Sequence, residues 1–308
     1  ISSLSTSYDL TFNVFINEYL SIVQRIYQSN RIHFFTSIVT CTGSTLLTLP
    51  NTIPSGFEVL VIRNASIRSI PKQAFRRMER LREIHIENCD QLIFLEKFAF
   101  KSMKKLRLIS FANCPRLNEI PKSTFSGIAN ELGVKIHFHR TPVQRVHGGA
   151  FRHANNIREL SISGSDLALS RHAFASITQL DFLTVTGVTV IEPQLFINST
   201  RFHIVHLKEL NCEIPPHAFE DLAHVHQVLI QRSRISSVST DAFSGLSTVE
   251  TVELFNNQIG TISSRAFACK RHGYTMMRRY SADTCDPEFC KYLTIIVVVS
   301  QIIPCRKN

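Results

Sequence analysis

The sequence predicts an α/β fold in which about nine short repeats stack into a curved solenoid. Three observations lead to this prediction. Phenylalanine recurs nine times at intervals of 22 to 26 residues, seven of the nine follow an alanine, and the apolar residues between them fall at matching offsets. Self-similarity at such a period is the signature of stacked-repeat proteins, which work through one long surface. The nine residues are Phe75, Phe100, Phe125, Phe151, Phe174, Phe196, Phe219, Phe243 and Phe267.

The repeat unit is clearest in residues 81–105, LREIHIENCDQLIFLEKFAFKSMKK. Its apolar positions, together with Cys89, match the pattern L-x-x-L-x-L-x-x-(N/C)-x-L of leucine-rich repeats. The L-x-L core alternates and therefore predicts a short strand with one face inward. Asparagine or cysteine at the turn can satisfy backbone groups that the turn frees. The sequence thus predicts a leucine-rich repeat solenoid with a curved parallel sheet on its concave side and a short helical or irregular convex side.

The units differ in regularity along the chain. The third repeat copies the second, and the last two fit the same template, with Asn257 at the turn position. The fifth and sixth units, which end at Phe174 and Phe196, are shorter than average. The stretch around Asn130–Leu132 instead carries about two extra residues, so we expect the solenoid to be irregular there.

Four segments follow from the extent of the repeats. They are a poorly defined N-terminal segment (1–40, a helix or an unprocessed leader), an N-terminal cap (41–56), the repeats (57–268) and a cysteine-containing C-terminal cap or hinge-like segment (269–308). The apolar run 293–304 is shorter than the about 20 residues that a membrane span needs. It predicts either a buried β-segment or the beginning of a longer span.

Charge points to acidic partners. The 308 residues carry a formal net charge of +10 with 19% charged residues, which excludes a disordered chain on composition. Sulfated glycans, anionic membranes and acidic proteins are candidate partners, whereas nucleic acid is disfavoured because no groove-reading motif is present. Eight basic residues lie between the Ile/Pro position of a repeat and the next strand, a region expected on the convex side, where they predict either a solvated face or a glycan-binding stripe. They are Lys72, Arg76, Arg77, Arg80, Lys97, Lys101, Lys104 and Lys105.

The cysteines fall into groups. Cys89 and Cys114 occupy turn positions and are expected as buried thiols, as is Cys212 within a later repeat. Cys41 precedes the first repeat and resembles a cap cysteine. The end of a solenoid exposes its core, so the four cysteines after the last repeat predict a disulfide-stapled cap with three alternative connectivities. These disulfide candidates are Cys269, Cys285, Cys290 and Cys305.

Two sequons, at Asn64 and Asn198, are candidate N-glycosylation sites and favour an extracellular or cell-surface protein. A glycan on Asn64 would lie near the concave face, whereas Asn198 follows a repeat phenylalanine in a loop. A cytosolic protein with reduced thiols is the alternative.

The chain resembles the leucine-rich ectodomain of the glycoprotein hormone receptors over roughly residues 41–268, most clearly in residues 60–128. The resemblance rests on repeats of 25 residues that contain ENCDQL and ANCPRL, and on the irregular stretch STFSGIANELGVKIHF after the third repeat. It implies an extracellular domain that binds a protein hormone on its concave sheet and signals through a G-protein-coupled transmembrane domain. The chain lacks such a domain, and the segment after Cys269 departs from the family's paired-cysteine hinge.

The strand template also predicts which residues face outward from the concave sheet. One column is Val61, His85, Ser110, His137, Ser161, Thr184, His206, Leu229 and Glu253. The next is Arg63, Glu87, Ala112, His139, Ser163, Thr186, Lys208, Gln231 and Phe255. Small polar residues in the middle would let a ligand backbone approach, and flanking charges would set its register.

The histidines in these columns do not predict a metal site. His85 and His206 lie about 10 Å and about 14 Å from His137, at the usual strand spacing, whereas metal–nitrogen bonds are about 2 Å. A further hypothesis is pH-sensitive ligand release through His137 and His139.

No catalytic motif, metal or cofactor is expected. The sequence favours a non-enzymatic extracellular module that binds a protein ligand on its concave sheet. The alternatives are a secreted matrix or adhesion protein that binds glycans or other proteins, and an intracellular scaffold.

Overall fold

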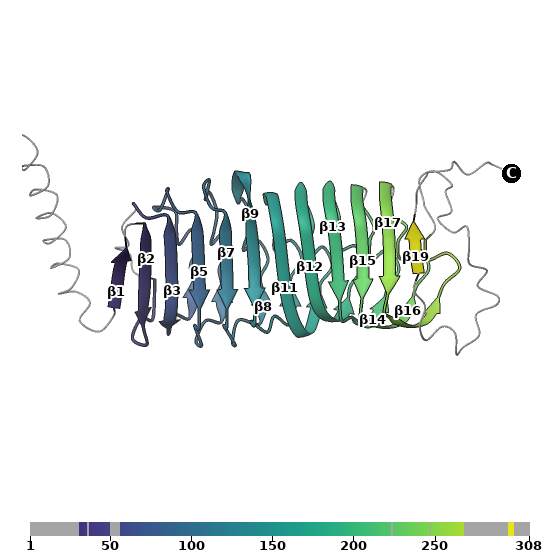
Figure 1. Cartoon of the computed structure of the whole chain (residues 1–308), viewed down its shortest axis with the longest axis horizontal. Coiled ribbons are helices and arrows are strands. Elements are labelled where there is room, and N and C mark those ends of the chain that lie inside the picture. The colour runs from purple at the N-terminus through teal and green to yellow at the C-terminus, as the bar shows by residue number, and fades with distance from the viewer. Residues whose placement is uncertain are drawn as a thin grey trace, which may run out of the picture.

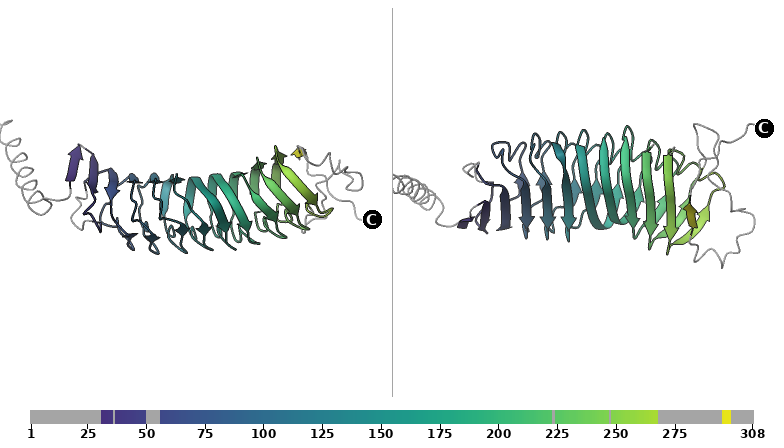
Figure 2. Two further views of the ribbon diagram at one scale, coloured as in Figure 1. Left: turned by 90° about the horizontal axis from the view of Figure 1, so that it is seen from below. Right: turned by 45° about the horizontal axis from the view of Figure 1, so that its top comes forward.

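The computed structural model describes residues 31–35, 37–49, 56–222, 224–246, 248–267 and 295–298. They form a curved solenoid whose long strands lie side by side on one face (Figure 1). Figure 2 shows this sheet on the concave side and short strands and turns on the convex side. The predicted leucine-rich repeat solenoid is therefore confirmed.

The concave sheet is parallel from β2 to β17, with one antiparallel strand at each end. Its strands in spatial order are β1 (Arg31–Phe35), β2 (Ile38–Gly43), β3 (Val59–Ala65), β5 (Glu83–Glu87), β7 (Leu108–Ala112), β9 (Ala129–His139), β11 (Asn155–Leu169), β12 (Gln179–Ile191), β13 (Arg201–Lys208), β15 (His224–Gln231), β17 (Thr248–Phe255) and β19 (Ile295–Val298). Buried and outward-facing residues alternate along the short strands, as in β5 and β7. This is the period-2 pattern that the L-x-L core predicts.

The convex side carries short strands and turns, with no helix among the described residues. Its strands are β4 (Ser69–Ile70), β6 (Phe94–Leu95), β8 (Glu119–Ile120), β10 (Arg145–Val146), β14 (Asn211–Ile214), β16 (Arg234–Val238) and β18 (Gln258–Ile262). The turns that follow contain residues with positive φ, such as Gln73 (53°) and Phe98 (60°). Gln73 N donates to Phe98 O of the next coil at 3.1 Å. Because these N–H groups bond along the solenoid axis, a local helix does not form.

The nine phenylalanines are all buried and form one continuous stack through the core. Successive ring centroids lie 4.6 to 6.2 Å apart with interplanar angles of 5 to 24°. Phe111 and Phe138 form a second, shorter stack at 4.9 Å, with edges toward Phe100 and Phe125. Such pairs add to the burial of each ring, so the stack helps hold neighbouring coils together.

The turn position works as expected. Asn257 Nδ2 donates to Ile230 O of the preceding coil at 2.8 Å, and its Oδ1 accepts from Ser233 N at 2.9 Å. Cys89 and Cys114 are buried at the same position, with each Sγ 3.8 Å from a carbonyl oxygen of the preceding coil. Burial raises the pKa of the Cys114 thiol to about 12.

The remaining cysteines differ in part from expectation. Cys212 is partly exposed, although it packs against the core, and burial raises its pKa to about 12. Cys41 is fully buried in β2, opposite Ile62 of β3. These two thiols, Cys89 and Cys114 are all free. The four predicted disulfide cysteines lie outside the described residues.

The sheet begins earlier than the expected first repeat at residue 57. Val39 and Cys41 of β2 point inward and Thr40 lies opposite Val61, so this segment continues the repeat register. Strand β1, within the segment expected as a helix or leader, pairs antiparallel with β2. At the other end, residues 295–298 of the apolar run form β19 and pair with β17. Among the described residues no helix is long and apolar enough to cross a bilayer.

Candidate ligand-binding face

The backbone pairing places the predicted outward-facing residues side by side. The column from Val61 to Glu253, here called the middle column, is continuous across nine strands, each residue paired with the next. The column from Arg63 to Phe255, here called the distal column, pairs in the same way from Arg63 to His139 and from Ser163 to Phe255. The template therefore places both columns in the register that the structure has.

A third column, which the sequence template missed, lies two residues nearer the strand starts. This proximal column consists of Val59, Glu83, Leu108, Lys135, Glu159, Phe182, Ile204, Gln227 and Thr251. Phe182 is 47% exposed and meets the His203 ring edge-on. The sequence pattern that could have predicted this column is the alternation of inward and outward residues, which continues one step before the L-x-L core. The face is thus three residues wide.

Charged residues in the first half of this face form ion pairs, one between β3 and β5 and one within β5. Arg63 Nε lies 3.0 Å from Glu87 Oε2, and His85 Nε2 lies 3.0 Å from Glu83 Oε2. These contacts satisfy most of the charge at this end and favour defined side-chain positions.

A second charged group lies beside them at the start of β11. Lys135 Nζ lies 3.1 Å from Glu159 Oε2, and His137 Nε2 lies 3.3 Å from Glu159 Oε1. The His137 contact has ion-pair distance without hydrogen-bond geometry, so its ring nitrogen keeps an unused hydrogen-bonding position.

The second half of the face is polar in a different way. His206 has a buried Nε2 without a hydrogen-bond partner, and burial, followed by the charge of Lys208, lowers its pKa. Because its pKa is lowered, His206 is neutral at physiological pH. Next to it, Gln227 Nε2 donates a hydrogen bond to Glu253 Oε1 at 2.8 Å.

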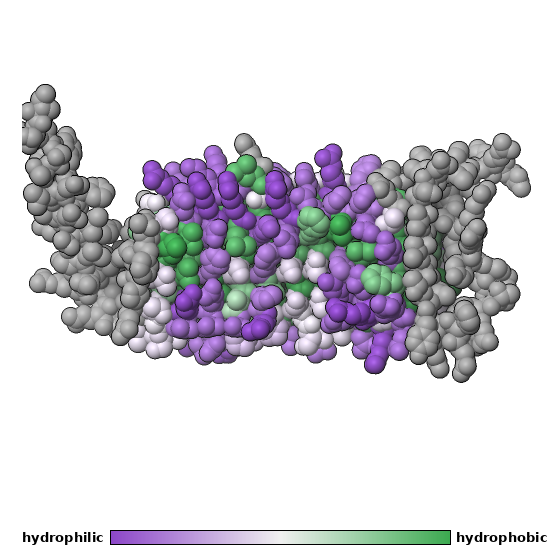
Figure 3. Space-filling view, in the orientation of Figure 1, coloured by the Kyte–Doolittle hydropathy of each residue, from purple (hydrophilic) through white to green (hydrophobic). Residues whose placement is uncertain are grey.

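Between these two halves lie four small hydroxyl residues. Ser161 pairs with Thr184, and Ser163 pairs with Thr186, so the four form a compact square on β11 and β12. All four are half-buried, and their hydroxyls have no partner among the described side chains and backbone groups. In Figure 3 the middle of this face is pale, between more hydrophilic margins. The square therefore offers hydrogen-bonding groups with little steric bulk.

The two sequons lie at opposite edges of the sheet. Asn64 is exposed at the end of β3, with φ of 51°, and Asn198 is exposed just before β13, with φ of 56°. Both positions can hold a glycan without disturbing the core.

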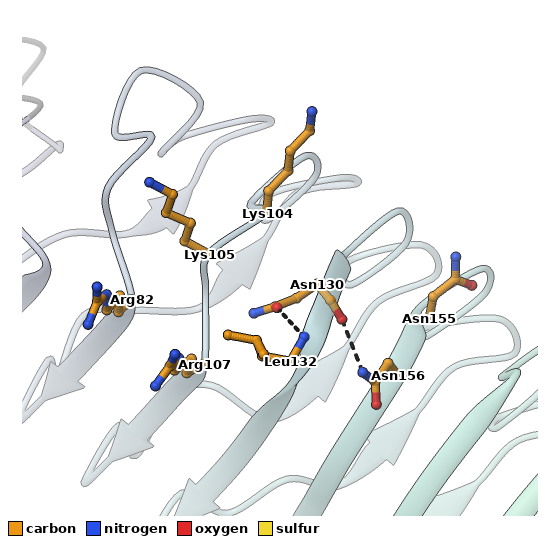
Figure 4. A pocket seen from close by; sticks show the side chains of 8 residues that line it. All are labelled: Arg82, Lys104, Lys105, Arg107, Asn130, Leu132, Asn155 and Asn156. Carbon is orange, nitrogen blue, oxygen red and sulfur yellow. Dashed lines mark hydrogen bonds between the residues drawn. The ribbon is translucent and has the colours of Figure 1, made fainter.

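The basic residues are not all on the convex side. Lys104 and Lys105 lie on the edge where the strands begin, with Arg82 and Arg107 (Figure 4). The prediction of a convex position is wrong for these two lysines. At Lys104 and Lys105 the chain that follows Phe100 has already turned back toward the start of β7 on the concave sheet. No group of three or more potential metal ligands occurs within the described part of the chain.

Stacked coils with a concave parallel sheet and an asparagine or cysteine turn define a leucine-rich repeat protein. A family model described as the BspA type leucine rich repeat region matches residues 56–181 and 167–275, with six copies. These matches cover more than half of the chain, which belongs to this family.

Several solved structures are similar, all at low identity. Human 5T4 (Wnt-activated inhibitory factor 1, trophoblast glycoprotein) is 16% identical, with a TM-score of 0.44, over 75% of this chain and 81% of that one. TLR13 in its complex with ssRNA13 is 16% identical, with a TM-score of 0.47, over 66% and 29%. Drosophila Toll in its complex with Spatzle is 13% identical, with a TM-score of 0.22, over 78% and 50%. No curated protein sequence matches the chain.

Proposed function

We propose that this protein is a non-enzymatic, extracellular binding module that holds a protein ligand on its concave sheet. The observation that carries this proposal is the square of four unpaired hydroxyls, Ser161, Ser163, Thr184 and Thr186, between two groups of charged residues. Small side chains let a ligand backbone come close, and free hydroxyls can donate to or accept from its peptide groups. The charged flanks would set orientation and association rate.

The dimensions of the face suit a protein ligand. Nine strands from β3 to β17 carry the three columns, and their eight intervals span about 38 Å at the usual strand spacing. Three columns extend about 13 Å along the strands. With the side chains at its margins, this surface approaches the about 800 Å² per partner that specific protein complexes bury.

A hormone-like or cell-surface protein is the ligand class we favour. The resemblance of residues 60–128 to glycoprotein hormone receptors supports it, as do the exposed sequons at Asn64 and Asn198. Peptide mapping of the protein from its native source tests the location. A glycan on either asparagine supports it, whereas two unmodified sites and reduced thiols throughout the chain favour an intracellular scaffold.

Binding on the concave face can be tested with a matched pair of double variants. Ser163→Arg with Thr186→Arg places two large charged side chains on paired strands in the middle of the face. Ser236→Arg with Thr261→Arg places the same charges on exposed residues of the neighbouring convex strands β16 and β18. Both proteins are screened against a panel of secreted and cell-surface proteins.

We expect a ligand captured by the unchanged chain to be lost by the concave variant and retained by the convex one. Loss by the convex variant alone would contradict the proposal. The same assay at about pH 5.5 and about pH 7.4 tests release through His137 and His139, and equal affinities would dispose of that role.

A further inference from the structure

We propose that the edge of the solenoid at the start of β5, β7 and β9 holds a second binding site, which takes the sulfate groups of a sulfated polysaccharide. The site is a recess of about 710 Å³ on the edge where the strands begin, separate from the hydroxyl square. Figure 4 shows its lining, which is Arg82, Lys104, Lys105, Arg107, Asn130, Leu132, Asn155 and Asn156.

The wall of the recess is built by the irregularity near Asn130. Ala129 pairs with Asn155 and Lys135 pairs with Glu159, so β9 uses two more residues than β11 between the same two pairings. The extra residues form a bulge that projects beside the neighbouring coil. A bulge at the edge of a sheet commonly redirects side chains at a functional site.

The bulge is held by contacts specific to its sequence. The Asn130 side chain is buried, its Nδ2 donates to Leu106 O, and its Oδ1 accepts from Leu132 N at 2.8 Å. Gly133 has φ of 82°, and the Arg158 side chain crosses it so closely that an added Cβ would lie 2.5 Å from Arg158 Cγ. Arg158 Nε then donates to Leu132 O at 2.8 Å. The recess is therefore a defined feature of the fold.

Four cations line the opposite wall. Arg82 and Arg107 each precede a strand, with Arg107 N donating to Arg82 O at 2.6 Å, and the two lysines lie in the turn above them (Figure 4). Arg82 has an acidic partner, since its Nη2 lies 3.3 Å from Glu58 Oε1. No other lining cation has an acidic partner within ion-pair distance among the described side chains. Three exposed positive charges thus remain available to an anion.

The rest of the lining indicates the kind of anion. Asn155 is exposed, and its Nδ2 can donate to a sugar hydroxyl group, while Leu132, 54% exposed, can contact the apolar face of a sugar ring. The volume lies in the range of about 300–1,000 Å³ typical of ligand pockets. No aromatic residue lines the recess, whereas single-stranded nucleic acid is normally held by aromatic stacking. A sulfated sugar fits this combination of groups best.

Two triple variants with equal charge loss test the proposal. Lys104→Gln, Lys105→Gln and Arg107→Gln neutralise the three unpaired cations of the recess. The control changes Arg76, Arg77 and Lys97 to Gln, which removes the same charge from exposed residues outside the recess. Binding of a heparin dodecasaccharide to each full-length protein is measured by titration calorimetry at physiological ionic strength.

We expect the recess variant to bind about tenfold more weakly, since three exposed ion pairs at about 0.5 kcal/mol each amount to that factor. The control should change affinity by less than about threefold, because its charges act only at a distance. Equal losses in the two variants, or no binding by the unchanged protein, would overturn the proposal.

A second pair of variants and two further probes separate ligand classes. Leu132→Asp adds a negative charge inside the recess, and Val190→Asp adds one at a similarly exposed apolar residue of another coil. Only the first should weaken heparin binding. An unsulfated hyaluronan oligosaccharide and a single-stranded DNA 12-mer should bind at least about tenfold more weakly than heparin. DNA or a poly-aspartate peptide that matches heparin, with the same loss in the recess variant, would replace the sulfated sugar by another polyanion and refute the assignment.

Discussion

Removing one ring from the phenylalanine stack tests the account of what holds the coils together. Phe125 is fully buried, with its centroid 5.2 Å from those of both Phe100 and Phe151. Phe125→Ala should cost about 4 kcal/mol for the lost burial and cavity. Each of its two stacked pairs, and its edge-on pair with Phe138, adds about 1 kcal/mol.

Phe267 provides the internal comparison. It is also buried, at 3% exposure, and it stacks on Phe243 alone at 4.7 Å within the described chain. Phe267→Ala should therefore cost about 2 kcal/mol less than Phe125→Ala, because Phe125 makes two more aromatic pairs. Phe125→Leu should cost less than Phe125→Ala, because leucine keeps most of the apolar area without the ring.

Guanidinium unfolding followed by far-UV circular dichroism measures all three variants. Equal or smaller loss for Phe125→Ala than for Phe267→Ala would refute the idea that each ring is stabilised by the coils on both sides of it.

Three further predictions concern single residues. Asn257→Ala should lower the free energy of unfolding by about 2–4 kcal/mol, because it leaves a buried carbonyl and a buried N–H unpaired. Asn257→Asp keeps the acceptor for Ser233 N but buries a carboxylate oxygen against Ile230 O, so at pH 7 it should cost at least as much; a denaturation midpoint near that of the unchanged protein for either variant would contradict this. His206 has a lowered pKa, so protonation favours the unfolded chain and the melting temperature should fall as pH drops below about 6.5. In His206→Gln the fall in melting temperature from pH 8 to pH 5 should be smaller, and the same pH profile in both proteins would contradict this role of His206. Burial raises the pKa of Cys41 and Cys114 to about 12, so neither thiol should react with a maleimide at pH 8 until denaturant is added. Mass spectrometry measures the labelling, and rapid labelling of the native protein would show that these coils open.

Much of the concave face follows from the sequence alone. The phenylalanines align the coils, and alternation within each strand then decides which residues face outward, so the repeat register by itself pairs Ser161 with Thr184. Both patterns are local, since they depend only on the period of a strand and the length of a coil. The proximal column was missed because the template ends at the L-x-L core, while strands such as β13 begin earlier.

The convex side and the two ends depended on contacts that the repeat pattern does not contain. The convex side, expected to be short helical or irregular, forms short strands and turns because turn residues such as Phe98 donate their N–H groups to the next coil. The sheet also extends to β2, whose place is defined by its pairing with β1 and β3.

The basic recess shows the boundary between sequence and tertiary structure most clearly. The chain by itself shows two extra residues near Asn130 and a surplus of lysine and arginine. That these belong to one site follows only from the folded coils, because Asn130 is anchored on Leu106 of the preceding coil and Arg158 crosses Gly133 from the next one. Periodicity thus determines the solenoid and the outward-facing columns, whereas contacts between successive coils decide where the surface is hollowed and which charges line it.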